Sequence, residues 1–155
     1  MGEMREILFR GKRKDNGKWV EGHYGEYYSG KENVSCISIS KETISGSLYY
    51  DVIPETVGQY TGLTDKNGTK IFENDIVTVY YNPKYVGVSK DRVGNFAVVF
   101  HDGCFMKRKI TNPMSGDAGL YHFIQSDEFE VIGNIHENPE LLGSNIHKVK
   151  TAESE

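Results

Sequence analysis

Short runs in which apolar and polar residues alternate dominate this chain, and almost no 3.6-residue period extends beyond two turns. Such alternation is typical of β-strands with one buried face, because successive side chains of a strand point to opposite sides. Clusters of Gly, Asn, Asp and Pro separate the runs and mark turns. The sequence therefore predicts a mainly β fold of short-strand hairpins.

The clearest hairpin lies near the N-terminus. Strand-like runs at 6–13 and 18–24 flank a turn that contains Asn16 and Gly17. Asn-Gly readily adopts the positive φ angles that tight hairpin turns require. Because Trp19 stands on a strand directly after this turn, we expect its ring to point into the core of the first sheet.

Further strand signals follow, and a second Asn-Gly turn lies at 67–68. The predicted strands are 35–40, 48–53, 76–81, 96–100, 105–110, 120–125 and 129–132. The last five suggest a small closed or half-closed barrel. One short C-terminal helical turn is predicted at 138–142, where Asn138 can cap the helix and Pro139 takes its first position.

Three separated motifs resemble the YopX family of phage and prophage proteins. They are LFRGKR at 8–13, VGQYTGLTDKNGTKIFENDIV at 57–77 and IGNIHENPELL at 132–142. The motif residues expected to be structural are Gly58, Gln59, Tyr60, Gly62, Asp65, Asn67, Gly68, Asp75, Gly133, Asn134, Asn138 and Pro139. The family usually has Gly where this chain has Asn74, and Asn is the non-glycine residue that best tolerates a positive φ.

This resemblance implies a mainly β fold with an SH3-like barrel in the C-terminal half, phage ancestry and self-assembly. It implies no catalytic residues. The expected organisation is an N-terminal β-hairpin region at 1–56, a YopX-like SH3-type barrel region at 57–143 and a mobile tail at 144–155. The first two regions could also fold as one unit.

Composition narrows the functional classes. The 155 residues carry a net charge of −4, with a basic start and an acidic end. No apolar run approaches the roughly 20 residues that span a bilayer. Cys36 and Cys104 lack metal-ligand spacing, and so do the five histidines. We expect a protein of the host bacterial cytoplasm, without metal, cofactor or membrane partner.

One cluster of carboxylates has two interpretations. Asp65, Glu73 and Asp75 could converge across the Asn67-Gly68 turn and form an acid–base pair or a Mg²⁺ site. Alternatively, Asp65 and Asp75 each hold a tight turn through hydrogen bonds to nearby backbone, as Asp commonly does. We favour the second interpretation.

Aromatic and basic residues form a second candidate site. The chain has ten tyrosines, more than the core of such a domain needs. A barrel face with stacking tyrosines and a basic run could bind single-stranded nucleic acid. The residues proposed for binding are Tyr60, Tyr80, Tyr81, Lys107, Arg108 and Lys109. Strand surface and subunit contacts are the alternative explanation, and the acidic net charge favours it.

The sequence thus predicts an uncharacterised phage or prophage accessory protein that is not an enzyme. We expect a self-associating β domain that binds a host or phage protein. Homo-oligomerisation is expected because few helices are available to cover the sheet edges. A β-barrel that binds single-stranded nucleic acid is the alternative, and a small hydrolase is the third candidate.

Overall fold

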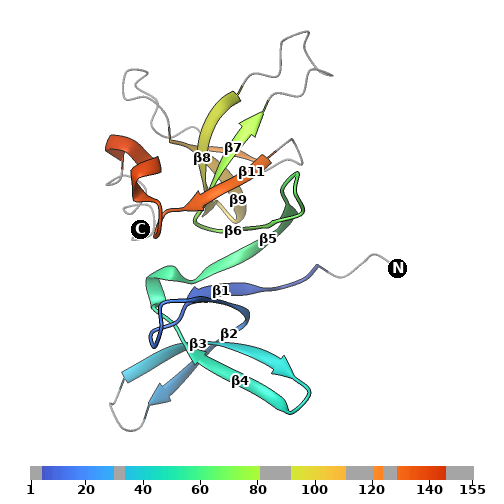
Figure 1. Ribbon diagram of the computed structural model, residues 1–155, viewed down its shortest axis with the longest axis vertical. Coiled ribbons are helices and arrows are strands. Elements are labelled where there is room, and N and C mark those ends of the chain that lie inside the picture. Colours follow the sequence, from blue (N-terminus) through green and yellow to red (C-terminus); the bar gives the residue numbers. More distant parts are fainter. Residues whose placement is uncertain (1–4, 30–33, 81–91, 111–120, 124–128, 146–155) are drawn as a thin grey trace. The chain divides into compact units, whose positions relative to one another are not determined.

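The computed structural model describes residues 5–29, 34–80, 92–110, 121–123 and 129–145 (Figure 1). Within these ranges the chain is mainly β, as predicted, and its helical structure consists of two 3-10 helices. The elements are β1 (Phe9–Lys12), β2 (Trp19–Ser29), β3 (Val34–Thr43), β4 (Gly46–Asp51), η1 (Pro54–Thr56), β5 (Gly58–Thr64), β6 (Lys70–Phe72), β7 (Asp75–Tyr80), β8 (Arg92–His101), β9 (Cys104–Lys109), β10 (Tyr121–Phe123), β11 (Phe129–Asn134) and η3 (Pro139–Asn145).

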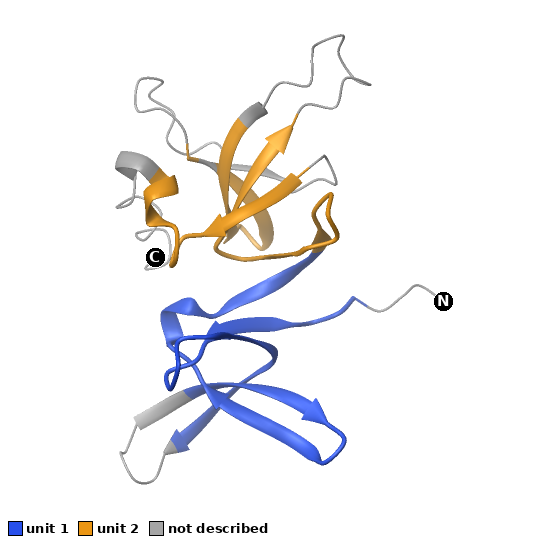
Figure 2. Ribbon diagram, viewed as in Figure 1, with its two compact units in different colours: residues 1–62 blue, residues 63–155 orange. Residues whose placement is uncertain are grey.

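Two compact units make up the chain, residues 1–62 and residues 63–155 (Figure 2). The boundary falls at Gly62, inside β5, where φ is 88°. It therefore lies C-terminal to residue 56, where the sequence suggested a boundary.

Unit 1 is built on the strand order β4-β3-β2-β1-β5, and β6 follows β5 in the same sheet beyond the boundary. The pairings β1–β2, β1–β5, β2–β3 and β3–β4 are all antiparallel. The β1–β2 hairpin turns at the predicted Asn16-Gly17 pair, where Gly17 has φ 68° and Arg13 N donates to Lys18 O at 2.9 Å. The dipeptide therefore performs the role that its conformational freedom predicts.

The sheet of unit 1 curls so that the end of β4 returns to the end of β1. Arg13 and Val52 form an isolated antiparallel bridge. Backbone hydrogen bonds join the two segments on both sides of this bridge, from Lys14 N to Asp51 O at 2.9 Å and from Ile53 N to Lys12 O at 2.8 Å. Val52 is fully buried at this point, and a Cβ on Gly11 would lie 2.9 Å from its Cβ atom. Glycine at position 11 therefore allows the close approach.

Trp19 is half-buried and its Nε1 atom is buried, so its ring is partly enclosed but is not a full member of the core as expected. The Arg10 guanidinium carbon lies 4.8 Å from the centroid of its ring. Trp19 shares its face of β2 with the exposed Glu21 and His23, because alternate residues of a strand point the same way. The indole is therefore covered by a cation on a polar face.

Unit 2 has a five-stranded antiparallel sheet in the order β10-β9-β8-β7-β11. All residues of β7 except Tyr80 are buried, and each face of the sheet carries its own core cluster. One cluster holds Ile76, Ala97, Val99, Ile110, Ile135 and Leu142. The other holds Ile71, Val77, Val79, Phe96, Val98 and Phe129.

The two clusters follow from the strand alternation, since Ile76 and Val77 point to opposite faces of β7. Leu142 of η3 belongs to one cluster and Ile71 of β6 to the other. The helical turn predicted at 138–142 is present as η3, and it continues beyond Leu142 to Asn145. Because β10 and β11 are the sheet's edges, the closed SH3-like barrel stays a prediction.

Candidate functional site

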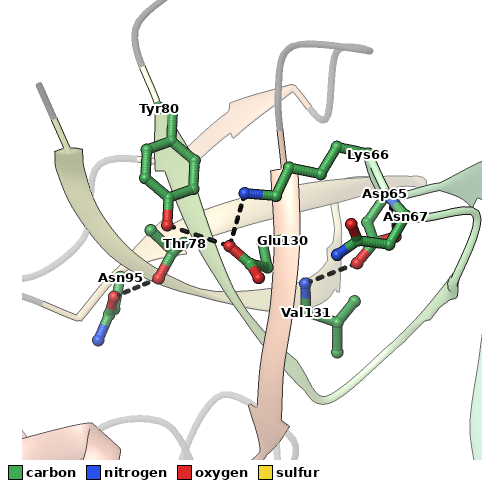
Figure 3. Close-up of polar contacts among 8 residues, drawn as sticks. All are labelled: Asp65, Lys66, Asn67, Thr78, Tyr80, Asn95, Glu130 and Val131. Carbon is green, nitrogen blue, oxygen red and sulfur yellow. Dashed lines mark hydrogen bonds and ion pairs between the residues drawn. The ribbon is translucent and has the colours of Figure 1, made fainter. Parts of the chain in front are cut away.

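Asp65 stands at the centre of the turn between β5 and β6. Its Oδ1 accepts hydrogen bonds from the backbone N of Asn67 and of Thr69, both at 2.8 Å. Its Oδ2 accepts one from Val131 N of β11 at 3.0 Å (Figure 3). The side chain is buried. Asp65 therefore closes its own turn and fixes that turn to the edge of the unit 2 sheet.

The surroundings of Asp65 favour its ionised form. Burial alone would raise the pKa of this carboxyl group, but the hydrogen bonds from Val131, Thr69 and Asn67 outweigh it and lower the pKa below its usual value. A general base that works near neutral pH needs a raised pKa. The chemistry of Asp65 therefore fits a structural anion better than a catalytic base.

Asp75 holds a different turn. Its Oδ2 accepts a hydrogen bond from Phe72 N at 2.8 Å, and the side chain is 1% exposed. Asn74 has φ 70°, so it adopts the left-handed conformation expected where the family usually has Gly. Glu73 is half-buried in the same turn. Within the described ranges, no group of three or more His, Cys, Asp or Glu side chains could hold a metal ion.

A third turn joins β11 to η3. The Asn134 Oδ1 accepts hydrogen bonds from His136 N and Glu137 N, each at 3.0 Å. The Asn138 Oδ1 accepts one from Asn134 N at 3.2 Å. A Cβ on Gly133 would lie 2.4 Å from that Asn138 oxygen, so glycine is required for this approach. These side chains fix the direction in which Pro139 starts η3.

A polar cluster on unit 2 joins Lys66, Tyr80 and Glu130 (Figure 3). The Lys66 Nζ lies 2.7 Å from the Glu130 Oε2 and 4.4 Å from the centroid of the Tyr80 ring. The Tyr80 hydroxyl donates to the same Oε2 at 3.0 Å. Lys66, then Tyr80, lower the pKa of the Glu130 carboxyl group by hydrogen bonding to it. The cluster joins the Asp65 turn to β7 and β11.

Sequence reasoning found Tyr80 but missed Lys66 and Glu130. The three residues come from the β5–β6 turn and from two strands that pair antiparallel, β7 and β11. No local pattern marks a partner that is 50 residues away in the chain, as Glu130 is from Tyr80. Finding this contact would have required the register between β7 and β11.

Lys107 and Arg108, the two described side chains of the basic run at 107–109, lie on opposite faces of β9. The Lys107 Nζ lies 5.3 Å from the centroid of Phe129 and 5.6 Å from that of Phe96. Arg108, the next residue of β9, points to the opposite face and is buried. The side chain of Lys109 lies outside the described residues.

The candidate tyrosines are also dispersed. Tyr60 is 7% exposed, and its backbone N donates to Leu8 O at 2.8 Å. Tyr80 is half-buried and hydrogen-bonded to Glu130. Tyr81 lies outside the described residues. Of the proposed nucleic-acid residues, the structure thus gives Tyr60 and Arg108 little exposed surface and engages Tyr80 and Lys107 in contacts of unit 2.

A family model described as YopX protein matches residues 8–143. The chain belongs to the YopX family. A solved structure, the crystal structure of protein EF1440 from Enterococcus faecalis, is similar to this YopX-family chain at 27% identity with a TM-score of 0.49. The likeness covers 90% of this chain and 99% of that one. No curated protein matches. Among the described residues, no helix has the length and apolarity to cross a membrane.

The YopX motifs contact one another in pairs. In unit 1, Phe9 and Arg10 of the first motif pair with Gln59 and Gly58 of the second. In unit 2, Asp75 of the second motif pairs with Asn134 of the third. Ile135 N also donates to Asn74 O at 3.0 Å. The motif residues named here therefore take part in strand pairing or in the adjoining turn.

Unit 1 of this YopX-family chain also has an open groove that the sequence did not predict. Its volume is about 540 Å³, and it is lined by Arg13, Lys14, Asp15, Tyr49, Tyr50 and Asp51. The Arg13 guanidinium carbon lies 4.4 Å from the centroid of the Tyr50 ring, and Nε donates to the Asp15 Oδ1 at 2.9 Å. This hydrogen bond raises the pKa of Arg13 and lowers that of Asp15. The groove is bounded by the β1–β2 turn and by β4.

Proposed function

We propose that this chain is a non-enzymatic accessory protein of a phage or prophage. It self-associates through its β surface and binds a host or phage protein in the cytoplasm of the host bacterium. The observation that carries the proposal is the concentration of exposed aromatic side chains on β2 and β4 of unit 1. They are Tyr24, Tyr27, Tyr28 and Tyr49, with Tyr28 65% and Tyr49 70% exposed.

Exposed tyrosines support protein binding because their rings bury apolar area while their hydroxyl groups keep a polar partner. Two of the three carboxylates considered for acid–base or metal chemistry, Asp65 and Asp75, accept backbone hydrogen bonds in turns of unit 2. Phage ancestry is supported by membership of the YopX family.

Light scattering of the full chain at micromolar concentration tests self-association. We expect a mass above the 17.5 kDa of one chain. A mass of 17.5 kDa alone would contradict this part of the proposal.

Affinity capture from phage-infected cells tests partner binding. We expect one protein to be retained by the tagged wild-type chain and lost with Tyr24→Ser combined with Tyr28→Ser. Phe100→Ser is the matched control, because Phe100 is an exposed aromatic residue of unit 2. Retention of the same proteins by all three chains would contradict a binding role for the unit 1 tyrosines.

A further inference from the structure

The four edge strands of the two sheets differ in how they are protected. The edges are β4 and β6 in one sheet and β10 and β11 in the other. β6 and β10 have three residues each, and β11 has a register shift between Val131 and Gly133. Short length and bulges both discourage pairing with another chain. β4 pairs with β3 over six consecutive positions and contains neither Lys nor Pro.

The orientation of the β4 backbone shows which of its groups face outward. Val52 N donates to Ile37 O of β3, whereas Asp51 O accepts from Lys14 N on the other side. Backbone groups of alternate residues in a strand point in opposite directions. Ser47 and Tyr49 therefore direct their N–H and C=O groups away from β3, as Asp51 does.

The surface along this edge suits a second strand. Leu48 is 49% exposed, and nothing lies within 4 Å of a Cβ built on Gly46. No charged residue occurs from Gly46 to Tyr50. Two copies of β4 could therefore approach without repulsion between like charges within these five residues.

We propose that two copies of this chain pair antiparallel through β4, with the two-fold axis at Leu48. This inference rests on the self-association proposed above and assigns its interface. In this register, Ser47 pairs with Tyr49 of the second copy, and Tyr49 pairs with Ser47 of the second copy. Each pair exchanges two backbone hydrogen bonds, which gives about four in total. The second copy would thus add its β4 strand to the edge of the sheet, and the addition of a strand to a sheet edge is a recurring mode of recognition between proteins.

Side-chain complementarity favours a second copy as the occupant. Leu48 faces Leu48 of the second copy, which buries two half-exposed apolar side chains against each other. Tyr50, which carries Arg13 stacked on its ring, faces Gly46 of the second copy. Because Gly46 has no side chain and open space around it, the stacked pair is accommodated.

Disulfide trapping tests the register. Leu48→Cys is made in the full chain with Cys36→Ser and Cys104→Ser, so that position 48 carries the sole thiol. Leu48 faces its symmetry mate in a non-hydrogen-bonded pair, where Cα atoms lie about 4.5 Å apart, within the range that a disulfide spans. We expect mild oxidation to give mostly covalent dimer. Ile44→Cys in the same background is the control, because Ile44 is fully exposed but lies at the hairpin tip, out of register.

Tyr49→Pro tests the edge itself. It removes an outward N–H and leaves the bonds to β3, so we expect the dimer to dissociate while circular dichroism keeps its β signal. Tyr49→Phe keeps the N–H and the ring, and it should remain dimeric. If the wild type is an oligomer but Leu48→Cys traps no more dimer than Ile44→Cys, the β4 interface is wrong and self-association stands. A monomeric wild type overturns both.

Discussion

The two units use their strands differently. In unit 2 the inner strand β7 is buried on both faces between two core clusters. Among the described residues of unit 1, the buried hydrophobic side chains are Ile39, Val52 and Tyr60. Of the large hydrophobic residues that the structure describes as exposed, all but Phe100 also lie in unit 1. Within the described ranges, unit 2 thus has the larger stabilising core, and unit 1 has more exposed apolar side chains.

This contrast predicts that the largest loss of stability comes from the core of unit 2. Phe129 is 1% exposed, so Phe129→Ala should lower the free energy of unfolding by about 3–5 kcal/mol. Phe100→Ala is the matched control, since Phe100 is 53% exposed, and we expect about 1 kcal/mol or less. Urea denaturation measures both. Equal losses of stability for the two variants would contradict the assignment of Phe129 to the stabilising core of unit 2.

Asp65 provides the next largest effect. Asp65→Ala leaves three backbone N–H groups without their acceptor, which should cost about 2–3 kcal/mol. Because the folded-state pKa of Asp65 is lowered, its contribution is complete above the unfolded value of 3.8 and is lost as pH falls through the folded pKa. Urea denaturation from pH 6 down to pH 2 should therefore show a smaller acid-induced loss for Asp65→Ala. An unchanged pH profile would contradict this role.

Gly22 tests the smaller core of unit 1. A Cβ at this position would lie 1.9 Å from the backbone oxygen of Ser40, so Gly22→Ala must separate β2 from β3. We expect a loss of about 1–3 kcal/mol and faster hydrogen exchange in β2 and β3, with β7 and β8 unchanged. Gly25→Ala is the control in the same strand, because its Cβ would lie 3.7 Å from the Ser38 hydroxyl oxygen. Faster exchange in β7 as well would show that the units do not respond separately.

These differences between the units were partly predictable. Turns depend on residues that are adjacent in the chain. The turn roles of Asn16-Gly17, Asp65 and Asn74 could therefore be predicted from the sequence. The polar cluster and the groove join residues that are distant in the chain, such as Tyr80 with Glu130 and Arg13 with Tyr50. The incomplete burial of Trp19 was not predicted for the same reason, since the cation that covers its ring lies on a neighbouring strand. Strand register decides such contacts, and one sequence does not specify it.

The polar cluster should contribute little to stability. Its ion pair is half-exposed, so Lys66→Met and Tyr80→Phe should each cost about 0.2–1 kcal/mol. A double-mutant cycle between these two changes measures their coupling through Glu130. A coupling of about 0.5 kcal/mol or more would show that the cluster acts as a unit, whereas strict additivity would contradict the shared contact with Oε2.

The smallest effect is expected for mutations of the basic run on the binding of nucleic acid. Lys107 lies over Phe96 and Phe129, and Arg108 is buried on the other face of β9, so these two described side chains of the run do not share one basic surface. We expect single-stranded oligonucleotides to bind no more tightly than the non-specific range of about 10⁻⁴ to 10⁻⁶ M at physiological salt. Lys107→Glu combined with Lys109→Glu should leave that weak binding nearly unchanged, as measured by fluorescence anisotropy. A nanomolar complex that this double variant abolishes would assign the partner-binding surface to unit 2 and would replace the protein-partner proposal with a nucleic-acid function.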